Sequence, residues 1–219
     1  MRVTHVHHSG FVVELEEHAL VFDWYAGDLP ALDPAAQVVV LVSHAHGDHY
    51  GRCAWDLEGP RTRYVLDRGL AREAQGHGSV TLVEPHRSYD LGDLRVETLE
   101  SNDEGVAFVV TCEGRRILFA GDLNVWWWDR PEPENRASEA FFRRELARVA
   151  GRVDVAFVPL DPRLADPVAG VVACEEELGP DALFPMHYGD EAARARELAA
   201  DARLDPWRDS VHLGDVTEL

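Results

Sequence analysis

A cluster of histidines directly after an apolar segment constrains this chain more than any other feature. Residues 38–43 read VVVLVS, and residues 44–49 read HAHGDH. A continuous apolar run of this kind is typical of a buried strand, so the cluster stands at a strand end rather than in a polar tract. Imidazole nitrogen and carboxylate oxygen suit zinc, iron and manganese. The cluster therefore predicts a metal site, in preference to a solvated histidine-rich loop.

The spacing inside the cluster indicates two neighbouring sites. Side chains alternate along an extended strand, so His44 and His46 are expected to share one face. A turn that begins at Gly47 would bring Asp48 and His49 toward a second position beside the first. One short stretch can thus begin two metal sites.

Two later apolar segments end in further candidate ligands. Residues 116–121, RILFAG, are followed by Asp122, and residues 182–186, ALFPM, are followed by His187. Alone, Asp122 would more often be a turn residue and His187 an ordinary core or surface histidine. In open α/β sheets, however, ligands collect beyond the carboxyl ends of the strands. The common placement of these residues with the first cluster favours one shared site.

Strands are expected early in the chain, and strand–helix alternation later. The expected strands cover residues 2–6, 11–15, 19–22, 37–42, 63–66, 80–83, 94–99, 106–111, 116–120, 154–158 and 183–185. The expected helices cover residues 138–150, 168–178 and 190 to about 202, with Asp190 as a candidate N-cap. This order indicates an α/β layered domain. With no linker or repeat in 219 residues, we expect a single domain over residues 1–219.

Charge narrows the function classes. The chain carries 21 basic residues, all of them arginine, against 40 acidic residues, and its formal net charge is −19. A surface this acidic repels phosphate backbones and anionic lipids, which disfavours nucleic-acid and membrane partners. The absence of lysine excludes a Schiff-base lysine, a pyridoxal-phosphate lysine and a P-loop lysine.

The cysteines and the N-terminus favour a cytoplasmic protein. Cys53, Cys112 and Cys174 are odd in number and widely spaced, as expected of reduced thiols rather than of a disulfide framework. The first residues enter a strand-like pattern without a secretory apolar region, and no apolar segment approaches the length of a membrane span.

The metal-ligand pattern also has a specific resemblance. HAHGDH matches the HxHxDH motif of the metallo-β-lactamase-fold hydrolases, and residues 120–122 (AGD) and 185–190 (PMHYGD) resemble their later metal-binding motifs. The opening, from HSGF at residues 8–11 to LVFD at residues 20–23, resembles the start of that family. The similarity covers nearly the whole chain and is closest to the small, stand-alone, largely uncharacterised members. It implies a four-layer αββα sandwich with a metal centre at one edge.

The resemblance implies six metal ligands in this sequence. Carried over residue by residue, His44 and His46 bind the first metal, Asp48, His49 and His187 bind the second, and Asp122 bridges the two.

One ligand of the family pattern is missing. Family members usually supply a further histidine before the bridging aspartate, but residues 99–105 read LESNDEG. Asp103 or Asn102 is a candidate substitute, and a weak or open first site is the other interpretation.

These features predict a metal-dependent hydrolase that acts on a small ester, lactone, amide or phosphoester. The expected cofactor is one or two divalent metal ions, zinc first, with manganese or iron as alternatives. Such ions activate a water molecule for attack, and Asp48 could also orient that nucleophile or shuttle a proton. The expected partner is a small-molecule substrate, and the oligomeric state stays open, with a homo-oligomer among the alternatives.

Three other functions stay open. One is a phosphodiesterase or nuclease of the same fold. Another is a metal-binding or ligand-binding protein that has lost catalysis together with the missing histidine. The third is a di-iron redox role in the same fold, although the chain offers no appended flavin domain to support it.

Several residues near the predicted ligands admit two interpretations. Of the three consecutive tryptophans at 126–128, at least one should border the metal crevice, as a substrate wall or as a packed anchor. Arg163 would clamp an anionic substrate group or pair with a nearby aspartate, Asp161 or Asp166. Tyr188 would donate to a substrate or pack. His7 and His8 are outer donors or ordinary surface histidines.

Overall fold

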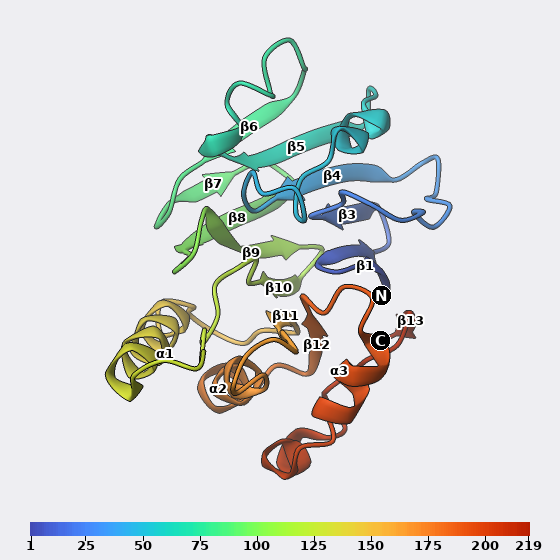
Figure 1. Ribbon diagram of the computed structural model, residues 1–219. Helices are drawn as coiled ribbons and strands as arrows, with labels where there is room; N and C mark the ends of the chain where they lie inside the picture. Colours follow the sequence, from blue (N-terminus) through green and yellow to red (C-terminus); the bar gives the residue numbers. More distant parts are fainter.

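Two β-sheets lie face to face in the computed structural model, which describes residues 1–219 (Figure 1). The seven-stranded sheet has the order β13-β1-β2-β3-β4-β5-β6, and the six-stranded sheet has the order β12-β11-β10-β9-β8-β7. The strands of the first sheet are β1 (Arg2–His7), β2 (Gly10–Glu14), β3 (His18–Phe22), β4 (Gln37–Val42), β5 (Thr62–Asp67), β6 (Val80–Val83) and β13 (Val216–Glu218). Those of the second are β7 (Ser88–Asp90), β8 (Leu94–Glu100), β9 (Val106–Cys112), β10 (Arg115–Phe119), β11 (Val155–Pro159) and β12 (Ala182–Met186).

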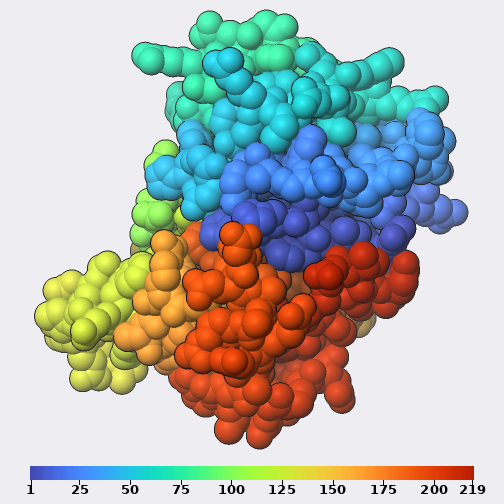
Figure 2. All heavy atoms as spheres, turned by 45° about the vertical axis from the view of Figure 1, so that its right-hand side comes forward, coloured from blue at the N-terminus to red at the C-terminus, as the bar shows by residue number.

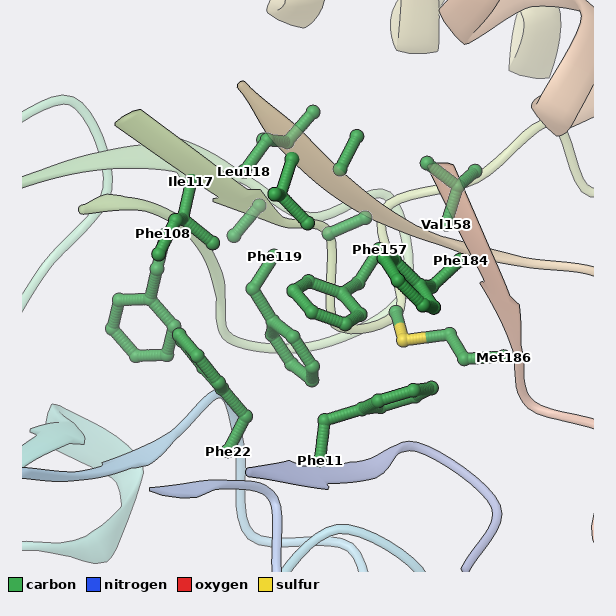
Figure 3. Packing of buried hydrophobic residues seen from close by; sticks show 14 of the residues in the cluster. Phe11, Phe22, Phe108, Ile117, Leu118, Phe119, Phe157, Val158, Phe184 and Met186 are labelled. Atoms are coloured by element: carbon green, nitrogen blue, oxygen red, sulfur yellow. The ribbon is translucent and has the colours of Figure 1, made fainter. Parts of the chain in front are cut away.

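Aromatic side chains fill the space between the two sheets (Figure 3). Phe22 of the first sheet stacks on Phe119 of the second at 4.7 Å between ring centroids, and Phe11 lies 4.6 Å from Phe157. Each such pair stabilises the fold by about 0.5–1.5 kcal/mol beyond its buried area. This packing fixes the strand ends of one sheet relative to those of the other.

Parallel strands of both sheets end at the same edge of the sandwich. In the first sheet β3 and β4 are parallel, and in the second β10, β11 and β12 are parallel. A polar residue that reaches the candidate site follows closely after each of these five strands: Asp23, His44, Asp122, Asp161 and His187. The expected convergence of strand ends is therefore present, and the ends of β3 and β11 take part in it.

The helices cover the two outer faces unequally. The α-helices are α1 (Glu132–Leu146), α2 (Ala169–Leu178) and α3 (Ala192–Leu198), and the 3₁₀ helices are η1 (Arg52–Leu57), η2 (Arg68–Leu70) and η3 (Ala202–Trp207). In Figure 1, α1 and α2 flank the second sheet. The outer face of the first sheet is covered by η1 and η2, which bury Ala54 and Leu70 against it. The layered architecture matches the expectation, although one outer layer is made of 3₁₀ turns and loops.

Some element boundaries differ from the sequence prediction. The helix expected at 138–150 begins at Glu132, because Pro133 and two acidic residues suit its first turn, and it ends at Leu146. The last α-helix spans Ala192–Leu198, without a side-chain cap from Asp190, and the chain then forms η3. Strands β7 and β13 were not predicted, because three-residue strands carry no readable alternation. None of the helices combines the length and apolarity needed to cross a bilayer.

Candidate metal centre

The carboxylate of Asp23 organises the turn that carries the histidine cluster. Its Oδ1 accepts the backbone N–H of Ser43 at 2.7 Å, and its Oδ2 accepts the Ser43 hydroxyl and the His49 Nδ1–H, both at 2.6 Å. Asp23 is fully buried and has a positive φ of 42°. A strained backbone at a buried, fully engaged carboxylate is typical of functional sites. Asp23 was not among the predicted site residues, although it follows an apolar strand, as Asp122 and His187 do.

The carboxylate of Asp122 lies at the centre of the candidate site. Its Oδ2 is 3.4 Å from His44 Nε2, while its Oδ1 is 3.1 Å from His49 Nε2 and 3.4 Å from His187 Nε2. Burial alone would raise the pKa of Asp122, but the surrounding imidazoles hold that pKa well below its usual range. Asp122 is therefore ionised and turns one oxygen toward each of two groups of rings.

The side chains around Asp122 form two groups, in each of which one potential ligand atom per residue lies within 4.8 Å of the others. The first group is His44, His46 and Asp122, and the second is His8, Asp48, His49 and His187. All six residues predicted as ligands thus lie together, in the two sets that the resemblance implies. His8 is the addition.

In each of four histidine rings, the nitrogen that faces away from the site (the outer nitrogen) is close to an oxygen acceptor. The pairs are His44 Nδ1 with Ser43 Oγ at 3.0 Å, His46 Nε2 with Glu104 Oε2 at 2.8 Å, His49 Nδ1 with Asp23 Oδ2 at 2.6 Å, and His187 Nδ1 with Asp161 Oδ2 at 3.2 Å. The Ser43 hydroxyl donates its own proton to Asp23, so it can only accept from His44. Outer acceptors of this kind place the ring proton outside and leave the inner nitrogen free for a metal.

The ring nitrogens and carboxylate oxygens that face the site are better suited to bind a cation than to hydrogen-bond to one another. His44 Nε2 and His46 Nδ1 lie 3.1 Å apart, and in this tautomer both present lone pairs. The contact between His49 Nε2 and Asp122 Oδ1 is close, but neither buried atom has a well-aligned hydrogen bond. Leaving such a group unsatisfied costs about 1–3 kcal/mol. A divalent cation in each group would satisfy these atoms, and nitrogen with carboxylate oxygen is a suitable donor set.

The Asn102 amide does not replace the histidine that is missing from the family pattern. The Asn102 side chain donates to the backbone oxygen of Asn124 at 2.8 Å and to Ser138 Oγ at 3.1 Å, so it holds the loop. Asp103 lines the cavity without joining either group. Glu104 reaches His46 from the outside. The first group therefore offers three protein ligands, the number at which catalytic zinc sites keep an open position.

Glu104→Ala is expected to weaken metal binding by the first group about 10–100-fold, because the His46 ring loses the acceptor that fixes its orientation. Competition against a chromophoric zinc chelator measures this affinity. Glu73→Ala is the matched control, since Glu73 is exposed and far from the rings in sequence. Equal zinc affinity in both variants would contradict the role assigned to Glu104.

The charge state of His49 predicts a proton release. Burial opposes a charge on this ring, but the Asp122 and Asp23 carboxylates outweigh it and raise the pKa of His49 to about 10. The protonated ring therefore stabilises the metal-free fold below the unfolded value of about 6.5, and this contribution is lost as the pH rises through 10.

A metal can bind only the deprotonated ring. Zinc binding at pH 8 is therefore expected to release about one proton from His49. Calorimetry in buffers of different ionisation enthalpy measures this release. The account of His49 fails if the binding heat does not depend on the buffer.

A cavity of about 540 Å³ opens beside the two groups. Trp126 and Trp128 line it and stack on each other with 6.1 Å between ring centroids. Trp127 instead packs under the Arg136 guanidinium, 5.3 Å from the ring centroid. The expectation that at least one of the three indoles borders the crevice is confirmed.

Other residues singled out in the sequence divide between the cavity and the scaffold. Arg163 pairs with Asp161 at 2.9 Å from Nε to Oδ1, as one of its two interpretations expected, and it also lines the cavity. The Tyr188 hydroxyl lies 3.2 Å from His5 Nδ1 and belongs to the packed interior. His7 contacts the Tyr25 hydroxyl at 2.8 Å, away from the two groups.

His8 reaches the site because the segment after β12 lies against the N-terminal hairpin. The backbone N–H of His187 donates to the His8 oxygen at 3.0 Å. Figure 2 shows this contact region, where the orange segment lies on the blue strands. His8 and His187 both have positive φ, of 56° and 70°. The N-terminal hairpin and the segment after β12 thus meet at the candidate site.

Comparison with known proteins identifies similar sequences over most of the chain. The family profile described as "Beta-lactamase superfamily domain" matches residues 2–130. A relative from Archaeoglobus fulgidus named "UPF0173 metal-dependent hydrolase" is 26% identical over 210 residues, covering 86% of this chain and 83% of the relative.

Solved structures share the fold. One is described as Igni18, a novel metallo hydrolase from Ignicoccus hospitalis; its TM-score is 0.67 at 15% identity, covering 100% of this chain and 98% of that one. The metallo-beta-lactamase fold protein YhfI from Bacillus subtilis gives a TM-score of 0.63 at 14% identity, covering 99% of each chain. The predicted family resemblance and fold are both confirmed.

Proposed function

Because the chain belongs to the beta-lactamase superfamily, we propose that it is a metal-dependent hydrolase of a small ester, lactone, amide or phosphoester. The observation that carries this proposal is the Asp122 carboxylate, which turns one oxygen toward each of two sets of ring nitrogens. The name of the Archaeoglobus relative supports the same class of reaction.

The proposed ligands follow from the two groups. His44, His46 and Asp122 would hold one ion, and Asp48, His49 and His187 would hold the other, with Asp122 shared. Divalent ions there would lower the pKa of a bound water toward about 7 and polarise the scissile carbonyl or phosphoryl oxygen. Zinc is the first candidate, since three protein ligands with an open position are typical of its catalytic sites.

The remaining residues of the cavity would bind and orient the substrate. Asp48 lines the cavity with a half-exposed side chain, and the neighbouring His8 ring holds the pKa of its carboxyl well below the usual range. Asp48 is therefore ionised and could bind a cation or orient the attacking water as a hydrogen-bond acceptor. Arg163 is placed to meet an anionic or electron-rich group, while Trp126 and Trp128 supply an apolar wall.

A small substrate suits this cavity better than a nucleic acid. Its volume of about 540 Å³ matches a small-molecule site. Asp103 and Glu134 line it as well, and the net charge of −19 opposes the approach of a polyanion. For the phosphodiesterase alternative, these features favour a small phosphoester as the substrate.

Metal reconstitution with a substrate panel tests the proposal. Chelator-treated protein would be loaded separately with zinc, manganese or iron(II) and assayed on a 4-nitrophenyl ester, a lactone, an anilide and a bis-aryl phosphodiester. We expect hydrolysis of at least one class only in the loaded protein, with one or two ions per chain by elemental analysis. Tight metal binding with no hydrolysis of any class would favour the non-catalytic binding protein instead.

A further inference from the structure

His8 differs from the other four histidine rings of the site in the hydrogen-bond partner of its outer nitrogen. The other four rings have an oxygen acceptor there, whereas His8 Nδ1 lies 3.1 Å from the backbone nitrogen of Gly189, which donates to it. A backbone N–H can only donate, so His8 Nδ1 must carry a lone pair. The proton of the neutral ring is then on Nε2, the nitrogen that faces the site.

The His8 nitrogen that faces the site lies near Asp48. His8 Nε2 lies 3.6 Å from Asp48 Oδ2 and is buried without any well-aligned hydrogen-bond partner in the chain. The backbone of His8 is fixed as well, since its oxygen accepts the N–H of His187 and its ring lies 4.1 Å from the His187 ring. His8 is thus held in place with an unpaired donor beside a proposed ligand.

We propose that His8 does not coordinate the second ion but donates from Nε2 to Asp48, and so positions that carboxylate. Proximity alone would group His8 with Asp48, His49 and His187 as a fourth ligand. The Gly189 N–H excludes this while it occupies Nδ1, because coordination through Nε2 would require the proton to move to Nδ1. The inference rests on the proposed metal site and assigns a separate role within it.

The tautomer of His8 can be read directly in the wild-type protein. Long-range ¹H–¹⁵N spectra of histidine-labelled protein distinguish a ring protonated at Nε2 from one protonated at Nδ1. A coupling across the hydrogen bond from the Gly189 amide to Nδ1 assigns the ring without any variant. We expect the Nε2–H form in both metal-free and zinc-loaded protein. A shift to the Nδ1–H form on zinc loading would overturn the proposal.

Zinc binding by three variants separates a donor from a ligand. His8→Gln keeps an N–H donor, whereas His8→Leu lacks one and shares the same positive φ, so their difference isolates the donor. We expect two zinc ions per chain and near wild-type affinity for His8→Gln, and a second-ion affinity about 10–100-fold lower for His8→Leu. His49→Gln, which removes a proposed ligand, should lose the second ion.

Loss of the second zinc in His8→Gln, as in His49→Gln, would show His8 to be a ligand and overturn the proposal. Equal affinity in His8→Gln and His8→Leu would overturn the donor role. These readouts are independent of turnover. If wild-type protein bound zinc but hydrolysed nothing, the proposed function would fail while the tautomer and zinc titrations still decided the role of His8.

Discussion

Asp122→Asn is expected to remove tightly bound metal from both groups and to lower hydrolysis by at least about 100-fold. Replacing an outer partner of a ligand alone typically costs 10–100-fold in metal affinity, and Asp122 faces both sets of rings directly. Asparagine keeps the size of the side chain but removes the charge that balances two cations. Elemental analysis measures the metal content, and an assay with the best substrate of the panel measures the rate of hydrolysis.

Asp129→Asn provides the matched control for Asp122→Asn. Asp129 is exposed and lies only seven residues further along the chain, so the same chemical change is made outside the site. The control should keep wild-type metal content and rate. An Asp122→Asn protein that stayed folded and held two ions per chain would contradict the central place given to Asp122.

Gly105→Ala is expected to destabilise the protein by about 3 kcal/mol or more and to weaken metal binding. Gly105 has a φ of +71°, and an added Cβ would lie 2.1 Å from the Ser43 oxygen and 2.6 Å from His44 Cβ. The first of these atoms is backbone, so the chain that carries His44 must move. Left-handed strain and overpacking each cost roughly 1–3 kcal/mol. Urea unfolding of metal-free protein and zinc titration measure the two losses.

Gly114→Ala separates strain from steric overlap. Gly114 has a similar φ of +73°, but nothing lies within 4 Å of an added Cβ. Only the left-handed penalty of about 1–2 kcal/mol is expected there. Equal destabilisation in the two variants, with unchanged zinc affinity in Gly105→Ala, would contradict the close approach of Gly105 to His44.

The sequence predicted the strands and the strand-end residues well, because both are local signals. The apolar run at β4 lies between two parallel neighbours, and such burial on both faces produces a continuous apolar pattern. His44, Asp122 and His187 each follow a buried apolar strand that has at least one parallel neighbour. Their meeting could be expected from the rule that parallel strands deliver ligands to one edge.

The residues that orient the ligands could not be read from the sequence. Asp23 binds Ser43 and His49, which lie 20 and 26 residues away. Glu104 reaches His46 only because the loop before β9 returns to the end of β4, where the Val106 N–H bonds the Ser43 oxygen. These contacts depend on how the two sheets pack. No spacing in the chain encodes them. His8 was a candidate outer donor, but its contact with Gly189, 181 residues away, also depends on the fold.

Anomalous diffraction from zinc-loaded crystals tests most directly whether two cations bind, one on each side of Asp122. The account predicts two peaks, one bounded by His44, His46 and Asp122 and the other by Asp48, His49 and His187. An anomalous map without a peak beside Asp122, in protein that keeps this fold, would contradict it.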